Sequence, residues 1–197
     1  MTLYTSLLLF AIAATVTPGP NNIMILSSGM NYGIRRSLPH WLGICLGAPA
    51  MLLILGLGLG SLVQQWPWLH LGIKLLGSAY LIWLAWKLAI TPARVAHDPN
   101  VKPMSFWQAV LFQWVNPKAW VMGVAAIAAF IDPGRDLVWQ MLIITCIFLL
   151  VGMLGVGLWL FAGKGLQYML RHSWQQRAFN VCMALLLLLS LYPMLQV

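Results

Sequence analysis

Six long apolar stretches, separated by short polar connections, limit what this chain can fold into. They cover roughly residues 3–27, 40–62, 68–90, 106–130, 138–161 and 175–195. Each supplies the about 20 mostly apolar residues that a helix needs to cross the hydrocarbon core of a bilayer. Only 7% of the 197 residues are charged and 61% are hydrophobic, which is too little polar surface for a soluble protein of this size. The sequence therefore predicts an all-α integral membrane protein with six transmembrane helices in a lipid bilayer, because membrane barrel strands would instead alternate polar and apolar residues.

Lysine and arginine are concentrated in alternate connections, which predicts the orientation in the membrane. Eight of them lie in or beside the first, third and fifth connections: Arg35, Arg36, Lys87, Arg94, Lys102, Lys164, Arg171 and Arg177. The other connections and both ends of the chain contribute only Arg135. Because basic connections remain in the cytoplasm, both termini are expected on the outer side. This topology explains the net charge of +8, so we do not expect nucleic-acid binding.

The polar connection of residues 91–105 divides a single transmembrane domain, residues 1–197, into two halves of about 1–90 and 106–197. Each half holds three spans, which is an odd number, so the second half enters the membrane upside down relative to the first. This is the arrangement of inverted-repeat secondary transporters. No lysine or arginine precedes the first stretch, so we expect a retained span there rather than a cleaved signal peptide.

Proline interrupts the first and fourth spans at matching positions. The residues of the two breaks are Thr17, Pro18, Gly19, Pro20, Asn21 and Asn22 in span one, and Asn116, Pro117 and Lys118 in span four. Each proline removes a backbone donor and pushes the preceding residue out of the helix. Pro117 follows Pro18 by 99 residues (117 − 18), about half the chain. Either break alone would be a kink satisfied by neighbouring helices, but interruptions in both halves indicate a transport site.

The residues of the two breaks predict a binding site for a zwitterion. Each break leaves a half-helix N-terminus with unpaired N–H groups and partial positive charge inside the membrane, and Lys118 adds a full positive charge. We therefore expect a substrate carboxylate there. The freed carbonyl groups of Ala14, Val16 and Gln113 and the three asparagine amides offer acceptors for an ammonium group. Lys74 in span three either lines this pathway or extends its ammonium group to the outer interface.

No pattern of catalytic or metal-binding residues is present in the sequence. The three cysteines are isolated, no histidine has a partner at metal-ligand spacing, and HExxH, GxSxG and paired intramembrane aspartates are missing. We therefore expect no enzyme activity, no metal and no cofactor. A channel would show polar residues along a helix, whereas polarity here is concentrated at the two breaks. The pairs Gly43/Gly47 and Gly56/Gly60 permit close helix approach, within the monomer, which we favour, or between the copies of a homodimer.

With these residues, the chain resembles the LysE/RhtB family of amino-acid exporters over essentially its whole length. The matching segments are TPGPNN at 17–22, YGIR at 32–35, KLLGSAYL at 74–81 and NPK at 116–118. The segments WLAWK at 83–87 and KPMSFW at 102–107 are most similar to the branch that exports cysteine and O-acetylserine.

This resemblance implies export of a small amino acid or derivative across the bacterial inner membrane, with both termini periplasmic, driven by the proton-motive force. The alternative is a transporter or channel for another small zwitterion or cation. Proton coupling commonly uses a buried carboxylate, yet no acidic residue lies in a predicted span. If protons are coupled, the carrier is Lys118, Lys74, His40 or the amine of the substrate, and the sequence does not choose among them.

Overall fold

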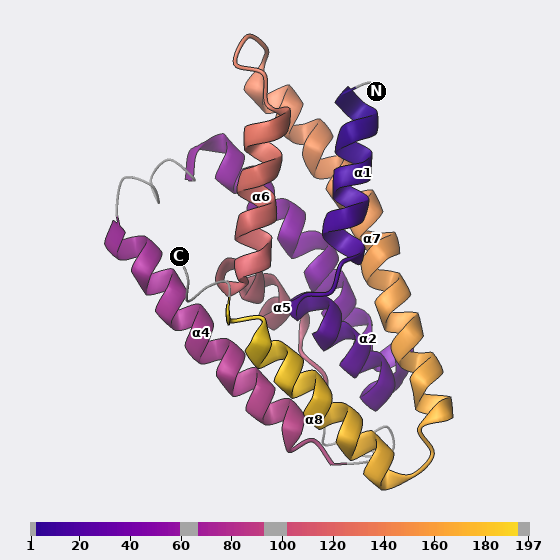
Figure 1. The fold of residues 1–197 in the computed structure, drawn as a ribbon. Helices are drawn as coiled ribbons and strands as arrows, with labels where there is room; N and C mark the ends of the chain where they lie inside the picture. Colours follow the sequence, from indigo (N-terminus) through magenta and orange to yellow (C-terminus); the bar gives the residue numbers. More distant parts are fainter. Residues whose placement is uncertain (1–2, 60–66, 93–101, 193–197) are drawn as a thin grey trace.

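The structure, a computed structural model, describes residues 3–59, 67–92 and 102–192, and every regular element in these ranges is helical (Figure 1). In chain order the elements are α1 (Leu3–Val16), α2 (Pro20–Ile54), the π-helical turn η1 (Leu55–Leu59), α4 (Pro67–Ala89), α5 (Phe106–Phe112), the 3-10 turn η3 (Gln113–Val115), α6 (Pro117–Phe130), α7 (Leu137–Met169) and α8 (Ser173–Leu189). The predicted all-α class is confirmed for these residues. Most of the predicted linker, residues 93–101, and Gly60 lie outside them.

Three helical segments of the described residues are long and apolar enough to cross a membrane: Pro20–Gly58, Leu71–Ala89 and Leu137–Met169. Leu3–Val16 and Pro117–Phe130 are shorter apolar helices. One face of α7 carries large apolar side chains that stay exposed, namely Leu150, Leu154, Leu158 and Phe161, each more than 60% accessible. A continuous apolar face of this kind suits contact with lipid chains and not with water.

A tight turn at Gly33 replaces the connection expected over residues 28–39. The helical conformation of α2 continues through this range and is interrupted only at Gly33, whose φ is 75°, a region that glycine adopts without steric cost. The chain folds back there, because Ser28 Oγ lies 2.8 Å from His40 Nδ1 and Ile25 packs with Ile44. Separate helical segments therefore lie on either side of Gly33, but the polar stretch expected to connect them is itself helical.

Helix α2 packs closely against both α7 and α5. A Cβ atom on Gly29 would meet the carbonyl oxygen of Leu160, and one on Gly163 would meet that of Leu26, so the backbones of α2 and α7 touch. Gly43 and Gly47 lie in the same way against α5. These small residues serve internal packing, which is one of the two uses that the sequence allows.

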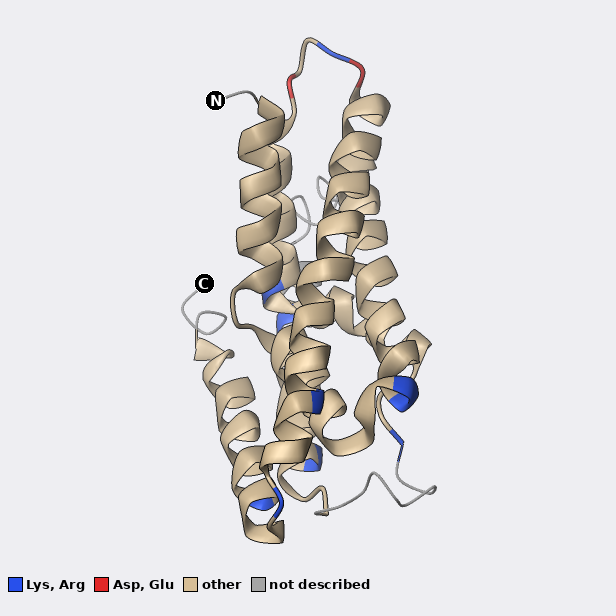
Figure 2. Cartoon of the chain, turned by 90° about the vertical axis from the view of Figure 1, so that its right-hand side faces the viewer, with Lys and Arg blue, Asp and Glu red and all other residues tan. Residues whose placement is uncertain are grey.

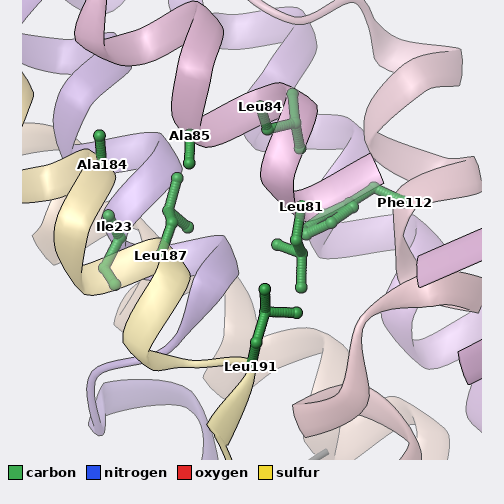
Figure 3. Packing of buried hydrophobic residues seen from close by; sticks show 8 residues of the cluster. All are labelled: Ile23, Leu81, Leu84, Ala85, Phe112, Ala184, Leu187 and Leu191. Atoms are coloured by element: carbon green, nitrogen blue, oxygen red, sulfur yellow. The ribbon is translucent and has the colours of Figure 1, made fainter. Parts of the chain in front are cut away.

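A hydrophobic cluster joins the two halves of the chain near α8 (Figure 3). Its buried members come from α2, α4, α5 and α8 and the residues just after it: Ile23, Leu81, Leu84, Ala85, Phe112, Ala184, Leu187 and Leu191. Phe112 is 1% exposed and stands at the end of α5. The cluster therefore fixes the position of the chain just before the interruption at Asn116.

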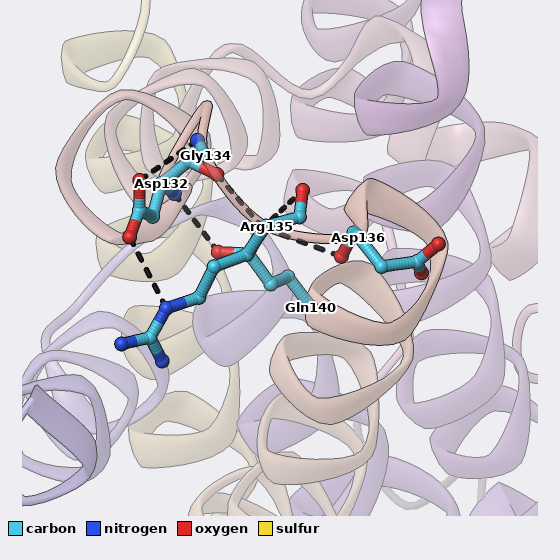
Figure 4. Close-up of polar contacts among 5 residues, drawn as sticks. All are labelled: Asp132, Gly134, Arg135, Asp136 and Gln140. Carbon is cyan, nitrogen blue, oxygen red and sulfur yellow. Dashed lines mark hydrogen bonds and ion pairs between the residues drawn. The ribbon is translucent and has the colours of Figure 1, made fainter.

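The loop between α6 and α7 holds the acidic residues that the structure describes (Figure 4). Asp136 caps α7 by accepting a hydrogen bond from the backbone N–H of Trp139 at 2.7 Å, and Asp132 forms an exposed ion pair with Arg135 at 3.2 Å. Figure 2 shows these acidic segments at one end of the molecule, while the basic segments outside this loop lie towards its middle and its other end. The described acids thus have local structural roles.

Candidate functional site

The first interruption is a short extended segment between α1 and α2. Gly19 has φ −177° and ψ 176°, and α2 begins at Pro20. Proline suits this position because an N–H group in the first helical turn has no acceptor within the helix. The Asn22 side chain is 3% exposed and donates to the carbonyl oxygens of Thr15 and Thr17, both at 2.8 Å. Asn22 therefore satisfies backbone acceptors that the end of α1 leaves without helical partners.

The second interruption lies between α5 and α6. Three residues of 3-10 helix, Gln113–Val115, end at Asn116, which has φ −86° and ψ 110°. Pro117 is the first residue of α6, and the Asn116 side chain caps this helix by accepting from the backbone N–H of Lys118 at 3.1 Å. Asn116 is 1% exposed, so it also contributes a polar group to the interior.

The two interruptions contact each other directly. The side-chain amides of Asn21 and Gln113 donate to one another, at 2.8 Å and 3.2 Å. The Lys118 ammonium lies 2.5 Å from the Thr17 carbonyl oxygen, 2.8 Å from the Thr17 hydroxyl and 3.4 Å from the Pro18 carbonyl oxygen. Segments about 100 residues apart in the sequence are thus joined by hydrogen bonds of both neutral and charged donors.

A cavity of about 90 Å³ lies at this junction. Five of the predicted site residues line it: Gly19, Asn21, Asn22, Asn116 and Lys118. The rest of the wall comes from α1, the second half of α2, α6 and α7, and it includes Thr15 and Cys45. A Cβ atom on Gly19 would lie 2.5 Å from Lys118 Cδ, so glycine lets the lysine side chain pass along the first interruption. We call this space the central cavity.

The other predicted site residues have different positions. Thr17 and Pro18 bind the Lys118 ammonium, and Pro20 and Pro117 begin the two helices that follow the breaks. Lys74 is half-buried on α4 and is not among the residues that line the central cavity. The geometry therefore groups the residues of the two breaks and leaves Lys74 apart from them.

Protein donors occupy carbonyl oxygens at the end of α1, including that of Val16, which was expected to be open to a ligand. The indole N–H of Trp159 donates to the Val16 carbonyl oxygen at 3.1 Å, and Lys118 and Asn22 share the carbonyl of Thr17. Sequence reasoning missed Trp159, which lies 143 residues from Val16. It also missed the role of the Gln113 side chain, which is fully buried, although a single glutamine three residues before Asn116 in an apolar span was a usable signal.

The central cavity suits a small ligand that carries a carboxylate. Lys118 is the one charged side chain among its described lining residues, and the amides of Asn21, Asn22 and Asn116 supply neutral donors and acceptors. The first turns of α2 and α6 both border it, so two helix N-termini add partial positive charge. Across the described ranges, no group of three or more histidine, cysteine or acidic side chains could hold a metal ion.

Comparison with known proteins gives consistent matches along the chain. The family model for LysE type translocators matches residues 12–191. The cysteine/O-acetylserine efflux protein of Escherichia coli strain K12 is 33% identical over 187 residues, 94% of each chain. The protein of the same name from Salmonella typhimurium strain LT2 is 34% identical over 179 residues, 90% of each chain.

No solved structure matches this chain. The family match spans both interruptions and the helices around the central cavity. It confirms the resemblance that the motifs at 17–22 and 116–118 indicate. The chain therefore belongs to the LysE type translocator family, whose members are transporters and not enzymes.

Proposed function

We propose that this protein is a secondary transporter that exports a small amino acid or derivative across the bacterial inner membrane, with the substrate bound in the central cavity. The observation that carries the proposal is the contact between the two interruptions, where Lys118 of one reaches the carbonyl oxygens of the other. Cysteine and O-acetylserine are the first substrates to test, because the similar proteins in two enterobacteria are named for them.

A zwitterion fits the contacts around Lys118. The lysine ammonium rests on the carbonyl oxygens of Thr17 and Pro18, and the ammonium of an amino acid offers the same three donors. A substrate that enters with its amine at these oxygens displaces Lys118, whose charge then pairs with the substrate carboxylate. Lys118 thus holds the position of the substrate ammonium at these oxygens and becomes a ligand of the carboxylate when the substrate binds.

The transport cycle follows from an inverted repeat of residues 1–90 and 106–197. The first half contributes the break after α1 and the second half the break before α6, and the two meet at one cavity. At about 90 Å³ this cavity is smaller than the roughly 300–1,000 Å³ of most small-molecule sites. Substrate entry therefore requires one repeat to move against the other, which is the usual route to alternating access in such folds.

The distribution of basic residues supports an orientation with both termini in the periplasm and the loop of Asp132–Asp136 on the outer side. The described helices contain no acidic residue, because the two described acids lie in this loop. The proton-motive force therefore acts through Lys118, Lys74, His40 or the amine of the substrate. His40 is fully buried, and its Nε2 has no hydrogen-bond partner among the residues that the structure describes. A homodimer stays a prediction, which native mass spectrometry of the purified protein tests.

Measurement of free amino acids inside and outside expressing bacterial cells by mass spectrometry tests the proposal. Wild-type protein should enrich one or a few small amino acids outside the cells, and Asn116→Ala should abolish this enrichment because it removes the α6 cap and an amide of the central cavity. A useful control is Gln140→Ala, since Gln140 bonds only within the α6–α7 loop. Unchanged pools across the whole amino-acid panel would refute the proposal.

A further inference from the structure

A second and larger cavity lies beside the first half of α2. Its volume is about 630 Å³, within the roughly 300–1,000 Å³ of small-molecule sites. Its walls are the first half of α2, the C-terminal part of α4 and residues 102–108, which lead into α5. It shares none of its described lining residues with the central cavity. We call it the lower cavity because the first half of α2 and the end of α4, which line it, lie in the lower part of Figure 1.

The charged residues of the lower cavity are two exposed lysines, Lys87 near the end of α4 and Lys102 before α5. No acidic side chain is among the described residues that line it. The Lys87 ammonium lies 4.9 Å from the centre of the Trp83 ring, and this ring stacks on Tyr80 at 5.4 Å. Two cations beside an aromatic wall suit a small molecule with a carboxylate and a short apolar body.

The floor of the lower cavity is polar and held in place by buried hydrogen bonds. Asn31 donates to the Ser27 carbonyl at 3.0 Å and exchanges hydrogen bonds with Asn180 of α8 at 2.8 Å and 3.2 Å. Asn180 is fully buried. A reciprocal amide pair in an apolar interior fixes both side chains, since breaking it would leave buried polar groups unpaired. These hydrogen bonds therefore fix the polar wall of the lower cavity, so the cavity is not a result of loose packing.

The two cavities follow one another along the same helix. Asn22 lines the central cavity and Ser28 lines the lower cavity, and six residues of helix span about 9 Å. Lys87 and Lys102 belong to the third connection, which the distribution of basic residues assigns to the cytoplasm. A substrate that leaves the cytoplasm would meet the lower cavity before the central one.

We propose that the lower cavity is an entry site, at which Lys87 and Lys102 bind the carboxylate of the substrate before it passes to the central cavity. This inference rests on the proposed function, because it concerns the same substrate. An entry site raises the occupancy of the transporter at low substrate concentration and leaves the later translocation step unchanged. Its loss should therefore alter KM and leave the maximal rate in place.

The test uses inside-out membrane vesicles, whose outer surface is the cytoplasmic face, and labelled O-acetyl-L-serine and L-cysteine as probes. The double variant Lys87→Gln/Lys102→Gln should raise KM about tenfold, the effect of losing one good charged contact, with a maximal rate within about twofold of wild type. The matched control is Lys164→Gln, because Lys164 lines neither cavity and bonds to Gln167 on its own helix.

The outcomes separate this inference from the function on which it rests. An unchanged KM in the double variant, with normal wild-type uptake, overturns the entry site and leaves the exporter in place. No wild-type uptake of either probe, together with no export of any amino acid by cells, overturns both. A KM change that disappears in proteoliposomes of pure phosphatidylcholine assigns the lysines to an anionic lipid head group and also overturns the entry site.

Discussion

Replacing Lys118 by methionine should disable transport while leaving the protein folded. The Lys118 ammonium donates to the carbonyl and hydroxyl oxygens of Thr17, and a charged hydrogen bond contributes about 1.5–3 kcal/mol. Both oxygens keep a second partner in the variant, because the carbonyl also accepts from Asn22 and the hydroxyl donates to Ala13. Removing a lysine from within a membrane helix also removes its cost of insertion into the bilayer, which is about 2.5–3.5 kcal/mol. The two terms offset each other, so the free energy of unfolding should change little.

The effect on transport should be much larger than the effect on stability. If Lys118 pairs with the substrate carboxylate, the variant loses a charged contact of about 1.5–3 kcal/mol with the substrate. Because each 1.4 kcal/mol is a factor of ten, kcat/KM for substrate exchange should fall about 10- to 150-fold. Methionine has nearly the length of lysine, so the volume of the central cavity should change little.

The assay is exchange of labelled O-acetyl-L-serine in proteoliposomes, with the thermal unfolding midpoint measured on the same preparations. Lys164→Met is the matched control, since Lys164 lies outside both cavities, and it should exchange substrate at the wild-type rate. Wild-type exchange by Lys118→Met would refute the role given to the ammonium. A loss of exchange that accompanies unfolding, or that Lys164→Met shares, would also refute the reasoning.

Three further substitutions test the packing and polar contacts around the site. Gly163→Ala should lower the thermal unfolding midpoint in detergent, because the added Cβ would meet the Leu26 carbonyl and force α2 and α7 apart, at a cost of about 1–3 kcal/mol. Gln113→Ala should cost about 1–3 kcal/mol by leaving the Asn21 amide without its partner, and an exchange assay should show reduced transport; full activity would contradict the link between the breaks. Ser105→Ala removes the capping box of α5 and should lower the thermal unfolding midpoint at a cost of about 1 kcal/mol; an unchanged midpoint would contradict the role of this cap.

The helices could be predicted because their causes lie within short stretches of sequence. Apolar runs longer than a bilayer core form helices wherever they occur, and proline removes backbone hydrogen bonds wherever it occurs. The positions of α4 and α6 therefore follow closely from the sequence, whereas α7 runs on to Met169, past the predicted end at about 161. The turn at Gly33 was missed because a single glycine with positive φ reverses a helix without any polar loop around it.

The contacts between distant residues could not be predicted from one sequence. The donation from Trp159 to Val16 and the pair of Asn21 with Gln113 join residues 143 and 92 positions apart. The two breaks were predicted from their prolines, but the way in which Lys118 lies on the carbonyl of Thr17 depends on how the two halves pack. The same is true of Lys74, whose separation from the central cavity follows from the placement of α4.

The central claim is that the paired breaks bind a zwitterion, and competition during exchange in proteoliposomes tests it most directly. Two pairs of compounds each differ by one charged group: O-acetyl-L-serine and N-acetyl-L-serine, which lacks the ammonium, and L-cysteine and cysteamine, which lacks the carboxylate. The account predicts that the zwitterion of each pair inhibits exchange of labelled O-acetyl-L-serine at least about tenfold more strongly than its partner, since each lost contact with a charged group is worth about 1.4 kcal/mol or more. Equal inhibition by the two members of either pair would contradict it.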